Sequence, residues 1–223
     1  KYFRIDGNRM ILGGMDHETG KQKGDPYAEL EKYFKKTFGI SNYKILKKWS
    51  GQVIESLDTL PFMGRTIFNK HRYIATGFAG AGMTMGTLSA MVNTDQILGR
   101  KNVYSEMFST LRIKSIFKIS LRGFNYFYHL FKDRFSRSDV SLDTLKKDSG
   151  AILNLNGEKV AVYKNEKGEL NKLSAVCTHL KCIVNWNDSE KTWDCPCHGS
   201  RFKKTGEVLA GPAREPLIRI GKK

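Results

Sequence analysis

The sequence predicts an α+β protein in two parts, a mixed N-terminal part followed by an all-β C-terminal part. In residues 26–38 apolar side chains recur at helical spacing. A second helix is expected over about residues 83–98 after a glycine-rich turn, and short strand-like runs lie between these stretches. From Val140 onward the spacing changes to two, which is typical of strands. All four cysteines lie between Cys177 and Cys197, so we expect the chemistry of the protein there.

The N-terminus predicts a hairpin followed by a helix. Two alternating runs within residues 1–14 flank Asp6-Gly7-Asn8, which is typical of a β-hairpin turn. Pro26 suits the first turn of a helix that we expect to end near Phe38. The apolar face of this helix would consist of Tyr27, Leu30, Phe34 and Phe38.

A glycine-rich turn precedes the second predicted helix. We expect a strand over residues 43–54, a turn and loop over residues 59–64, and a buried strand over residues 73–78. A turn at residues 79–86 then leads into a helix over about residues 83–98. A strand, a glycine-rich turn and a helix N-terminus together can hold an anion or a carbonyl oxygen. The glycine spacing differs from the dinucleotide fingerprint G-x-G-x-x-G, so close packing of helix on strand is an equal alternative.

Residues 104–140 connect the two parts and predict a basic amphipathic helix. Apolar side chains from Ile113 to Phe131 keep to one helical face, with basic residues such as Arg112 and Lys118 interspersed. Such a helix can lie on an anionic membrane. We favour the alternative, in which its aromatic face packs between the two domains.

The C-terminal part predicts short antiparallel strands. A clear hairpin surrounds Asn156-Gly157, with strands over residues 151–155 and 159–163. The further segments of the expected small antiparallel barrel are residues 170–176, 183–186, 192–193 and 217–220.

Two boxes of cysteine and histidine carry the chemistry. Residues 177–182 read Cys-Thr-His-Leu-Lys-Cys, and residues 195–200 read Cys-Pro-Cys-His-Gly-Ser. Each box can supply a thiolate and an imidazole, which suits zinc or a [2Fe–2S] cluster held by two Cys and two His. A zinc finger would show a Cys pair followed by a His pair, so the order favours the cluster over a structural zinc site. One further cysteine in each box, Cys182 and Cys197, remains to be explained.

The patterns C-T-H-L-x-C and C-P-C-H-G-S resemble those of the Rieske iron–sulfur domain. The resemblance implies that Cys182 and Cys197 form a disulfide between the two loops. It also implies that the two remaining cysteines hold the inner iron and the two histidines the outer, more exposed one. The implied ligands are Cys177, His179, Cys195 and His198.

Several neighbouring residues bear on the redox potential of such a cluster. By resemblance, Ser200 stands where a hydroxyl donates to a bridging sulfide and raises the potential. Pro212 belongs to a stretch that resembles the loop covering the cluster. Phe202 stands where high-potential members often have a tyrosine, so we expect a potential within about −150 to +300 mV but below the top of that range, which a redox titration would check. Lys181 departs from the glycine common at its position.

Four motifs in the N-terminal part point to a second family. They are Met10-Ile11-Leu12-Gly13-Gly14, Trp49-Ser50-Gly51, Leu60-Pro61-Phe62-Met63-Gly64, and Gly77-Phe78 continuing to Thr84. Together they resemble the C-terminal part of FAD-dependent oxidoreductases of the D-amino-acid oxidase type. The resemblance implies that the last motif lies against a flavin ring, because donors at a helix start stabilise reduced flavin. The implied FAD contacts are Gly80, Gly82, Met83 and Thr84.

The two resemblances imply a division into domains. We expect a C-terminal portion of an FAD-dependent oxidoreductase domain over residues 1–110, a helical linker over residues 111–140 and a Rieske [2Fe–2S] domain over residues 141–223. In the flavoprotein family a G-x-G-x-x-G strand lies upstream of a stretch like residues 1–14. We therefore expect the chain to be the C-terminal portion of a longer flavoprotein, binding FAD poorly and inactive as an enzyme when alone.

The formal net charge of +16 is spread along the whole chain. Such a charge suits nucleic acid, an anionic membrane or an acidic protein partner. No nucleic-acid-binding motif accompanies it, so a solvated surface that docks an acidic redox partner is favoured over nucleic acid. No run of about 18 apolar residues exists, so we expect no transmembrane helix and no membrane association. Sparse cysteine use is consistent with a cytoplasmic location.

These features predict an electron-transfer module of a flavin-dependent oxidoreductase. The cluster would exchange single electrons with the flavin domain or a redox partner, and the full-length enzyme would act on an amine-like small molecule. The alternatives are a non-enzymatic redox carrier or sensor and the Rieske component of a quinol-oxidising complex. The additional cysteines argue against an oxygenase with a separate mononuclear iron. No catalytic residue is assigned, because His17, His71 and His129 are best explained by surface or packing roles.

Overall fold

The computed structural model describes residues 1–56, 58–112 and 141–221. This part of the chain forms two compact units. The first unit contains residues 1–48 and the described residues from 141 onward, and the second contains the described residues from 49 to 112. The predicted linker, residues 111–140, lies outside the described residues except for its first two positions.

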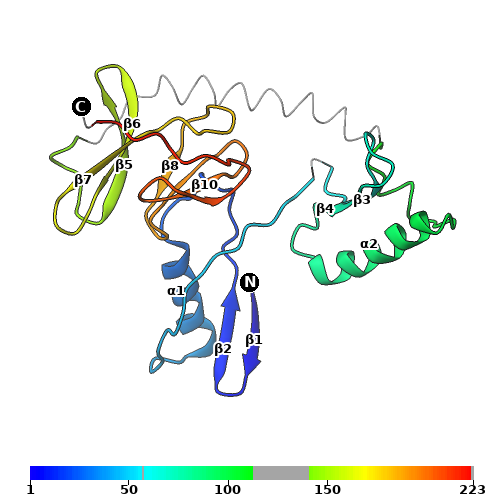
Figure 1. The fold of residues 1–223 in the computed structure, drawn as a ribbon. Helices are drawn as coiled ribbons and strands as arrows, with labels where there is room; N and C mark the ends of the chain where they lie inside the picture. The colour runs from blue at the N-terminus through cyan, green and yellow to red at the C-terminus, as the bar shows by residue number, and fades with distance from the viewer. Residues whose placement is uncertain (57, 113–140, 222–223) are drawn as a thin grey trace. The chain divides into compact units, whose positions relative to one another are not determined.

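The first unit begins with the predicted hairpin and helix, drawn in blue in Figure 1. Strands β1 (Tyr2–Asp6) and β2 (Arg9–Gly13) pair antiparallel. Helix α1 (Pro26–Phe38) has the predicted bounds. Its N-terminus is capped by the Asp25 side chain, and Gly39 ends it in the left-handed conformation. Both predictions are confirmed. The residues that specify these elements lie within them or next to them in the sequence.

The C-terminal part of this unit contains two antiparallel sheets (Figure 1). In the three-stranded sheet, β6 (Glu158–Lys164) lies between β5 (Ser149–Leu155) and β7 (Leu170–Ser174). The hairpin predicted around Asn156-Gly157 is therefore confirmed. The four-stranded sheet has the order β11-β10-β9-β8. Its strands are β8 (Asn185–Asn187), β9 (Thr192–Asp194), β10 (Arg201–Lys203) and β11 (Val208–Ala210).

One hydrophobic core draws on both of these sheets. Leu173, Trp193 and Phe202 are fully buried in it, and so are the sulfur-bearing side chains of Cys177 and Cys195. Burial of each such side chain contributes roughly 1.5–3 kcal/mol. The core therefore fixes the strands from which the two cysteine boxes project.

The prediction of a single small barrel for the C-terminal part was wrong, because the structure has these two sheets instead. Residues 217–220 form no strand: Arg219 forms one isolated bridge with Leu173, and Leu217 N donates to Gly206 O at 2.9 Å. Strands β10 and β11 were not predicted. Each has only three residues, too few for a period of two to be recognised.

The second unit packs one helix on a two-stranded sheet. Strands β3 (Phe62–Arg65) and β4 (Tyr73–Thr76) pair antiparallel, and helix α2 (Gly82–Ile97) contacts both. Its small core is formed by Met63, Val92 and Phe108. The predicted strand at 73–78 and helix at 83–98 are confirmed within a few residues.

Three predictions around this unit were wrong. Residues 43–54 form no strand: they pair with no described strand, and side chains such as Leu46 and Ile54 are exposed. The loop predicted over residues 59–64 ends early, since β3 begins at Phe62. Strand β4 was predicted to be buried but is only half-buried, since it belongs to a two-stranded sheet that packs against the single helix α2.

Among the described residues, none of the helices has the length and apolar content needed to cross a membrane.

Candidate metal centre

The first box forms a closed loop after β7. Cys177 N donates to Cys182 O at 2.8 Å, and Lys181 N donates to Cys177 O at 3.1 Å. A bridge between Val176 and Ile183 holds the base of the loop. These bonds fold residues 177–182 back on themselves, so both ends of the box lie in the core.

The second box repeats this geometry between β9 and β10. Cys195 N donates to Ser200 O at 2.7 Å, and Gly199 N donates to Cys195 O at 3.1 Å. In each loop the first cysteine is therefore held at the strand end by backbone bonds, and the histidine lies further along the loop.

The two loops bring the predicted residues together in pairs. Cys177 and Cys195 are free thiols, exposed by only 1% and 2%. The imidazole rings of His179 and His198 lie 5.0 Å apart between centroids and are nearly perpendicular. His198 is exposed and His179 half-buried. The sulfur side of the site is thus buried and its imidazole side reaches the surface.

The two thiols influence each other strongly. A hydrogen bond with Cys195 lowers the pKa of Cys177 to about 6 against the opposing effect of burial, and donors at His179 and Ser200 add to this. The same pairing and burial raise the pKa of Cys195. Desolvation, followed by the charge of His179, holds the pKa of His198 below its usual range. Donors directed at one buried sulfur and a neutral imidazole at the surface are what a metal centre with thiolate and imidazole ligands requires.

The predicted disulfide between Cys182 and Cys197 is present. The sulfur atoms of Cys182, Cys195 and Cys197 all lie within 4.8 Å of one another, so the disulfide packs beside a free thiol. Two of these three sulfurs are bonded to each other, which leaves Cys195 as the one able to ligate a metal. The donor set that fits a [2Fe–2S] cluster is therefore one free cysteine and one histidine from each loop.

The residues predicted to tune the cluster differ in exposure. Ser200 is fully buried, and its Oγ accepts a hydrogen bond of 3.0 Å from Ala213 N. The neighbouring Pro212 follows a cis peptide bond and is exposed. Phe202 is fully buried in the core. The loop that contains Pro212 is therefore anchored to the second box through Ser200.

Lys181 has the left-handed backbone conformation, with φ +64°. This region costs an L-residue about 1–2 kcal/mol, which explains why a glycine would suit the position. We expect Lys181→Gly to raise the free energy of unfolding by about 1 kcal/mol, because the greater freedom of glycine in the unfolded chain offsets part of the relief. Urea denaturation of the whole chain would measure it. Lys203→Gly in β10 is the control and should lower the free energy of unfolding. A change in the same direction in both variants would refute this explanation.

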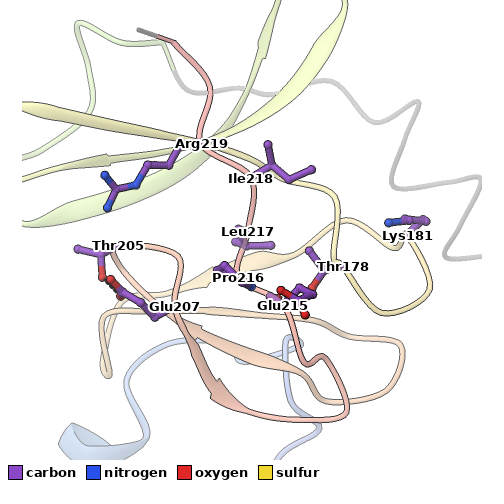
Figure 2. Close-up of a pocket in the computed structure, with 9 residues that line it drawn as sticks. All are labelled: Thr178, Lys181, Thr205, Glu207, Glu215, Pro216, Leu217, Ile218 and Arg219. Atoms are coloured by element: carbon purple, nitrogen blue, oxygen red, sulfur yellow. Dashed lines mark hydrogen bonds between the residues drawn. The ribbon is translucent and has the colours of Figure 1, made fainter.

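A groove of about 640 Å³ lies beside the first box (Figure 2). Thr178 and Lys181 line it from the box, and Thr178 Oγ1 donates to Glu215 O at 2.6 Å. Figure 2 shows Lys181 on one side of the groove, with Arg219, Thr205 and Glu207 on the other side. Its lining carries both signs of charge, from Lys181 and Arg219 and from Glu207 and Glu215.

The predicted FAD contacts lie at the start of α2. Gly80, Gly82, Met83 and Thr84 are all exposed, and Met83 is exposed by 91%. The N-cap residue, Ala81, supplies no side-chain cap for the helix. The structure thus shows an accessible helix N-terminus at the glycine-rich turn.

The two described histidines outside the boxes, His17 and His71, belong to no metal-ligating group in the described part of the chain. His17 Nδ1 lies 3.1 Å from Met15 O, and both His17 and His71 are exposed. His129 lies outside the described residues.

Sequence reasoning missed a buried charged group next to the second box. Arg201 Nε donates to Asp194 Oδ1 at 3.0 Å, and the same guanidinium pairs with Glu190. Asp194 also accepts hydrogen bonds from Asn187 and Thr192. The one available signal was an acidic residue directly before Cys195.

Comparison with known proteins covers both parts of the chain. Residues 139–220 match the family model of the Rieske [2Fe-2S] domain, and residues 1–96 match that of the FAD dependent oxidoreductases. A Bacillus subtilis (strain 168) protein named as a Rieske 2Fe-2S iron-sulfur protein, YhfW, is 35% identical over 227 residues, which covers 99% of this chain and 44% of that protein. The chain therefore spans less than half the length of this relative.

Other relatives match the C-terminal part. The cytochrome b6-f complex iron-sulfur subunit of Chlorobaculum thiosulfatiphilum is 50% identical over 66 residues, which covers 30% of this chain and 36% of that subunit. Among solved structures, the plasma membrane Rieske protein PetC3 from Synechocystis PCC 6803 is 35% identical, with a TM-score of 0.30, covering 33% of this chain and 76% of that one. The chain thus joins a region of the FAD-dependent oxidoreductase family to a C-terminal Rieske [2Fe-2S] domain.

Proposed function

We propose that the chain is the iron–sulfur electron-transfer module of a flavin-dependent oxidoreductase. The observation that supports this most is the pair of buried free thiols, Cys177 and Cys195, with His179 and His198 on the exposed side of the same two loops. The two families imply a [2Fe–2S] cluster and FAD as the cofactors. The match of one chain to both families supports a redox role in which both cofactors take part.

In this proposal Cys177 and Cys195 hold the inner iron, and His179 and His198 hold the outer one. When bound, a cluster of this kind takes up and releases one electron at a time. The residues of the chain keep water from the sulfur side and leave the imidazole side open to a partner. The disulfide keeps the two loops together whether or not the ligands are engaged.

The flavin part of the proposal concerns the longer protein. There Gly80, Gly82, Met83 and Thr84 would contact FAD at the start of α2. A flavin can accept two electrons from a substrate and release them singly, which suits a one-electron acceptor in the same protein. We propose a small amine-like substrate and a cytoplasmic location.

A second candidate is the Rieske component of a quinol-oxidising complex. It is favoured by the 50% identity over 66 residues to a cytochrome b6-f iron-sulfur subunit. The match of residues 1–96 to the flavoprotein family model supports the leading proposal instead. A carrier or sensor without enzymatic activity would share the cluster but need no flavin.

Optical and EPR spectra before and after dithionite, together with metal analysis, test the cluster. A rhombic signal on reduction with average g near about 1.9 is expected for a [2Fe–2S] cluster with His ligands. Stoichiometric zinc in a colourless, EPR-silent protein would overturn the proposal. Electron exchange with the flavin is tested in the longer protein, where reduction of the flavin by substrate should be followed by reduction of the cluster.

Removal of the Ser200 hydroxyl is expected to lower the redox potential. The hydroxyl lowers the pKa of Cys177, so it stabilises negative charge on that sulfur, and the reduced state is the more negative one. If the hydroxyl stabilises the reduced state over the oxidised state by about 1.4 kcal/mol, its removal lowers the potential by about 60 mV for one electron. EPR-monitored titration of Ser200→Ala would measure the shift. Ser149→Ala, in β5, is the control and should leave the potential unchanged; an unchanged potential in Ser200→Ala would contradict the assignment.

A further inference from the structure

A short segment of the N-terminal region lies against the C-terminal domain. This docking segment, residues 20–27, connects β2 to α1 and contacts the hairpin formed by β8 and β9. Both sides of the contact belong to the same compact unit.

Four hydrogen bonds make this contact. Three join two side chains, and one joins a side chain to a backbone oxygen. Asn185 Nδ2 donates to Gly20 O at 2.8 Å, and Gln22 Nε2 donates to Ser189 Oγ at 3.0 Å. Ser189 Oγ in turn donates to Asp25 Oδ1 at 3.1 Å. Tyr27 OH donates to Glu190 Oε1 at 2.9 Å. Polar groups on the two sides are thus matched at Gly20, Gln22, Asp25 and Tyr27.

The start of α1 is included in this contact. Asp25 Oδ1 accepts from Tyr27 N at 2.9 Å and from Ala28 N at 3.3 Å, so one carboxylate caps the helix and binds Ser189. Burial, followed by the hydrogen bond to Glu190, raises the pKa of Tyr27 to about 12. The helix is therefore attached to the hairpin at its cap and at its first turn.

The contact continues to the second cysteine box. Glu190, which accepts from Tyr27, pairs with the buried Arg201, and Arg201 pairs with Asp194. Asp194 directly precedes Cys195 in the sequence. A chain of charged hydrogen bonds thus joins α1 to the residue beside a proposed ligand.

Gly20 lies directly on the backbone of that box. A Cβ at this position would lie 2.7 Å from Pro196 N and 2.9 Å from Asp194 O. The residue also has φ +76°, which favours glycine. Only a residue without a side chain permits this approach to the loop that carries Cys195.

We propose that the docking segment fixes β1, β2 and α1 on the second cysteine box, so that this part of the N-terminal region works as a docked part of the cluster domain. The inference rests on the proposed function for its redox meaning. The partner that binds the hairpin and the second box is the docking segment of the same chain. In this polar segment Gly20 contacts the loop, and Tyr27 binds Glu190, whose carboxylate is paired with Arg201. Any electron exchange across this contact would then take place over a constant distance.

Hydrogen exchange of the whole chain with Gly20→Ala tests the docking. We expect at least tenfold faster exchange over residues 17–27 and over residues 195–200. Gly24→Ala is the matched control, because Gly24 has a similar φ of +70° but its Cβ would meet only Glu29 Oε1, at 3.7 Å. Equal exchange in the two variants would overturn the proposal.

A change on the opposite side of the contact tests it independently of Gly20. Asn185→Ala removes the donor to Gly20 O from the C-terminal side and should accelerate exchange over residues 17–27, while the core strand β6 keeps its protection. Tyr27→Phe should do the same and also shift the EPR g values of the reduced cluster. If both leave residues 17–27 unchanged, the segment is not held by this contact. Hydrogen exchange can be measured whether or not the protein contains a cluster. The experiment can therefore contradict the docking without contradicting the proposed function, and the reverse.

Discussion

Replacement of both Cys182 and Cys197 by serine is expected to lower the free energy of unfolding by about 3 kcal/mol. The disulfide closes a loop with a sequence separation of 15 residues, and a crosslink of this length restricts the unfolded chain by about that amount. The bond also joins the two loops that present the proposed ligands. Urea denaturation of the C-terminal part, followed through Trp186 and Trp193, would measure the loss. Release of iron to a chelator should be faster in the same variant.

The single variants separate the crosslink from packing. Cys182→Ser and Cys197→Ser each break the same bond, so each should lose about as much stability as the double variant. If the stability were due to the packing of two independent sulfurs, the two single losses would add up to the loss of the double variant. Additive losses would therefore show that the crosslink is not the cause.

The parts of the fold that sequence predicted well are set by neighbouring residues. Helix α1 has the predicted bounds because Asp25, Pro26 and Gly39 specify its start and end within the local chain. The hairpin at Asn156-Gly157 is specified in the same way. The cysteine boxes were identified because metal ligation demands particular residue types at particular spacings.

The parts that sequence did not predict depend on a partner elsewhere in the chain. Residues 43–54 have strand composition but pair with no described strand, and composition alone cannot supply a partner. The group formed by Glu190, Asp194 and Arg201 is invisible for the same reason. Each charge there is buried only because the fold brings the others to it.

Arg112 shows this limit most clearly. Its sequence position suggests one of several basic residues interspersed in an amphipathic stretch. In the structure its side chain is 9% exposed and pairs with Asp58, which is 7% exposed. Arg112 Nη1 also donates to Pro61 O at 2.7 Å, and the guanidinium lies 3.8 Å from the centre of the Phe62 ring. This one residue thus holds the Leu60-Pro61-Phe62 motif that relates the chain to the flavoproteins.

Arg112→Met is therefore expected to cost about 3–5 kcal/mol of the stability of the second unit. Arg112 Nε lies 2.6 Å from Asp58 Oδ2 and both side chains are nearly buried, and removing one partner of such a pair costs more than the pair contributes. Hydrogen exchange of β3, β4 and α2 in the whole chain would report the loss locally. Arg65→Met, at an exposed position in β3, is the control and should change the exchange little.

A second change distinguishes the uncompensated charge from lost packing. Asp58→Asn in the Arg112→Met background removes the remaining charge and keeps the shape of the side chain, including its hydrogen bond from Ser56 Oγ. The double variant should recover part of the stability that the single variant loses, because the buried carboxylate is the costly group. A double variant that is as unstable as Arg112→Met, or less stable, would show that the loss comes from the hydrogen bonds that Arg112 donates to Leu60 O and Pro61 O. Arg112 would then stabilise the motif through these bonds and not by compensating the charge of Asp58.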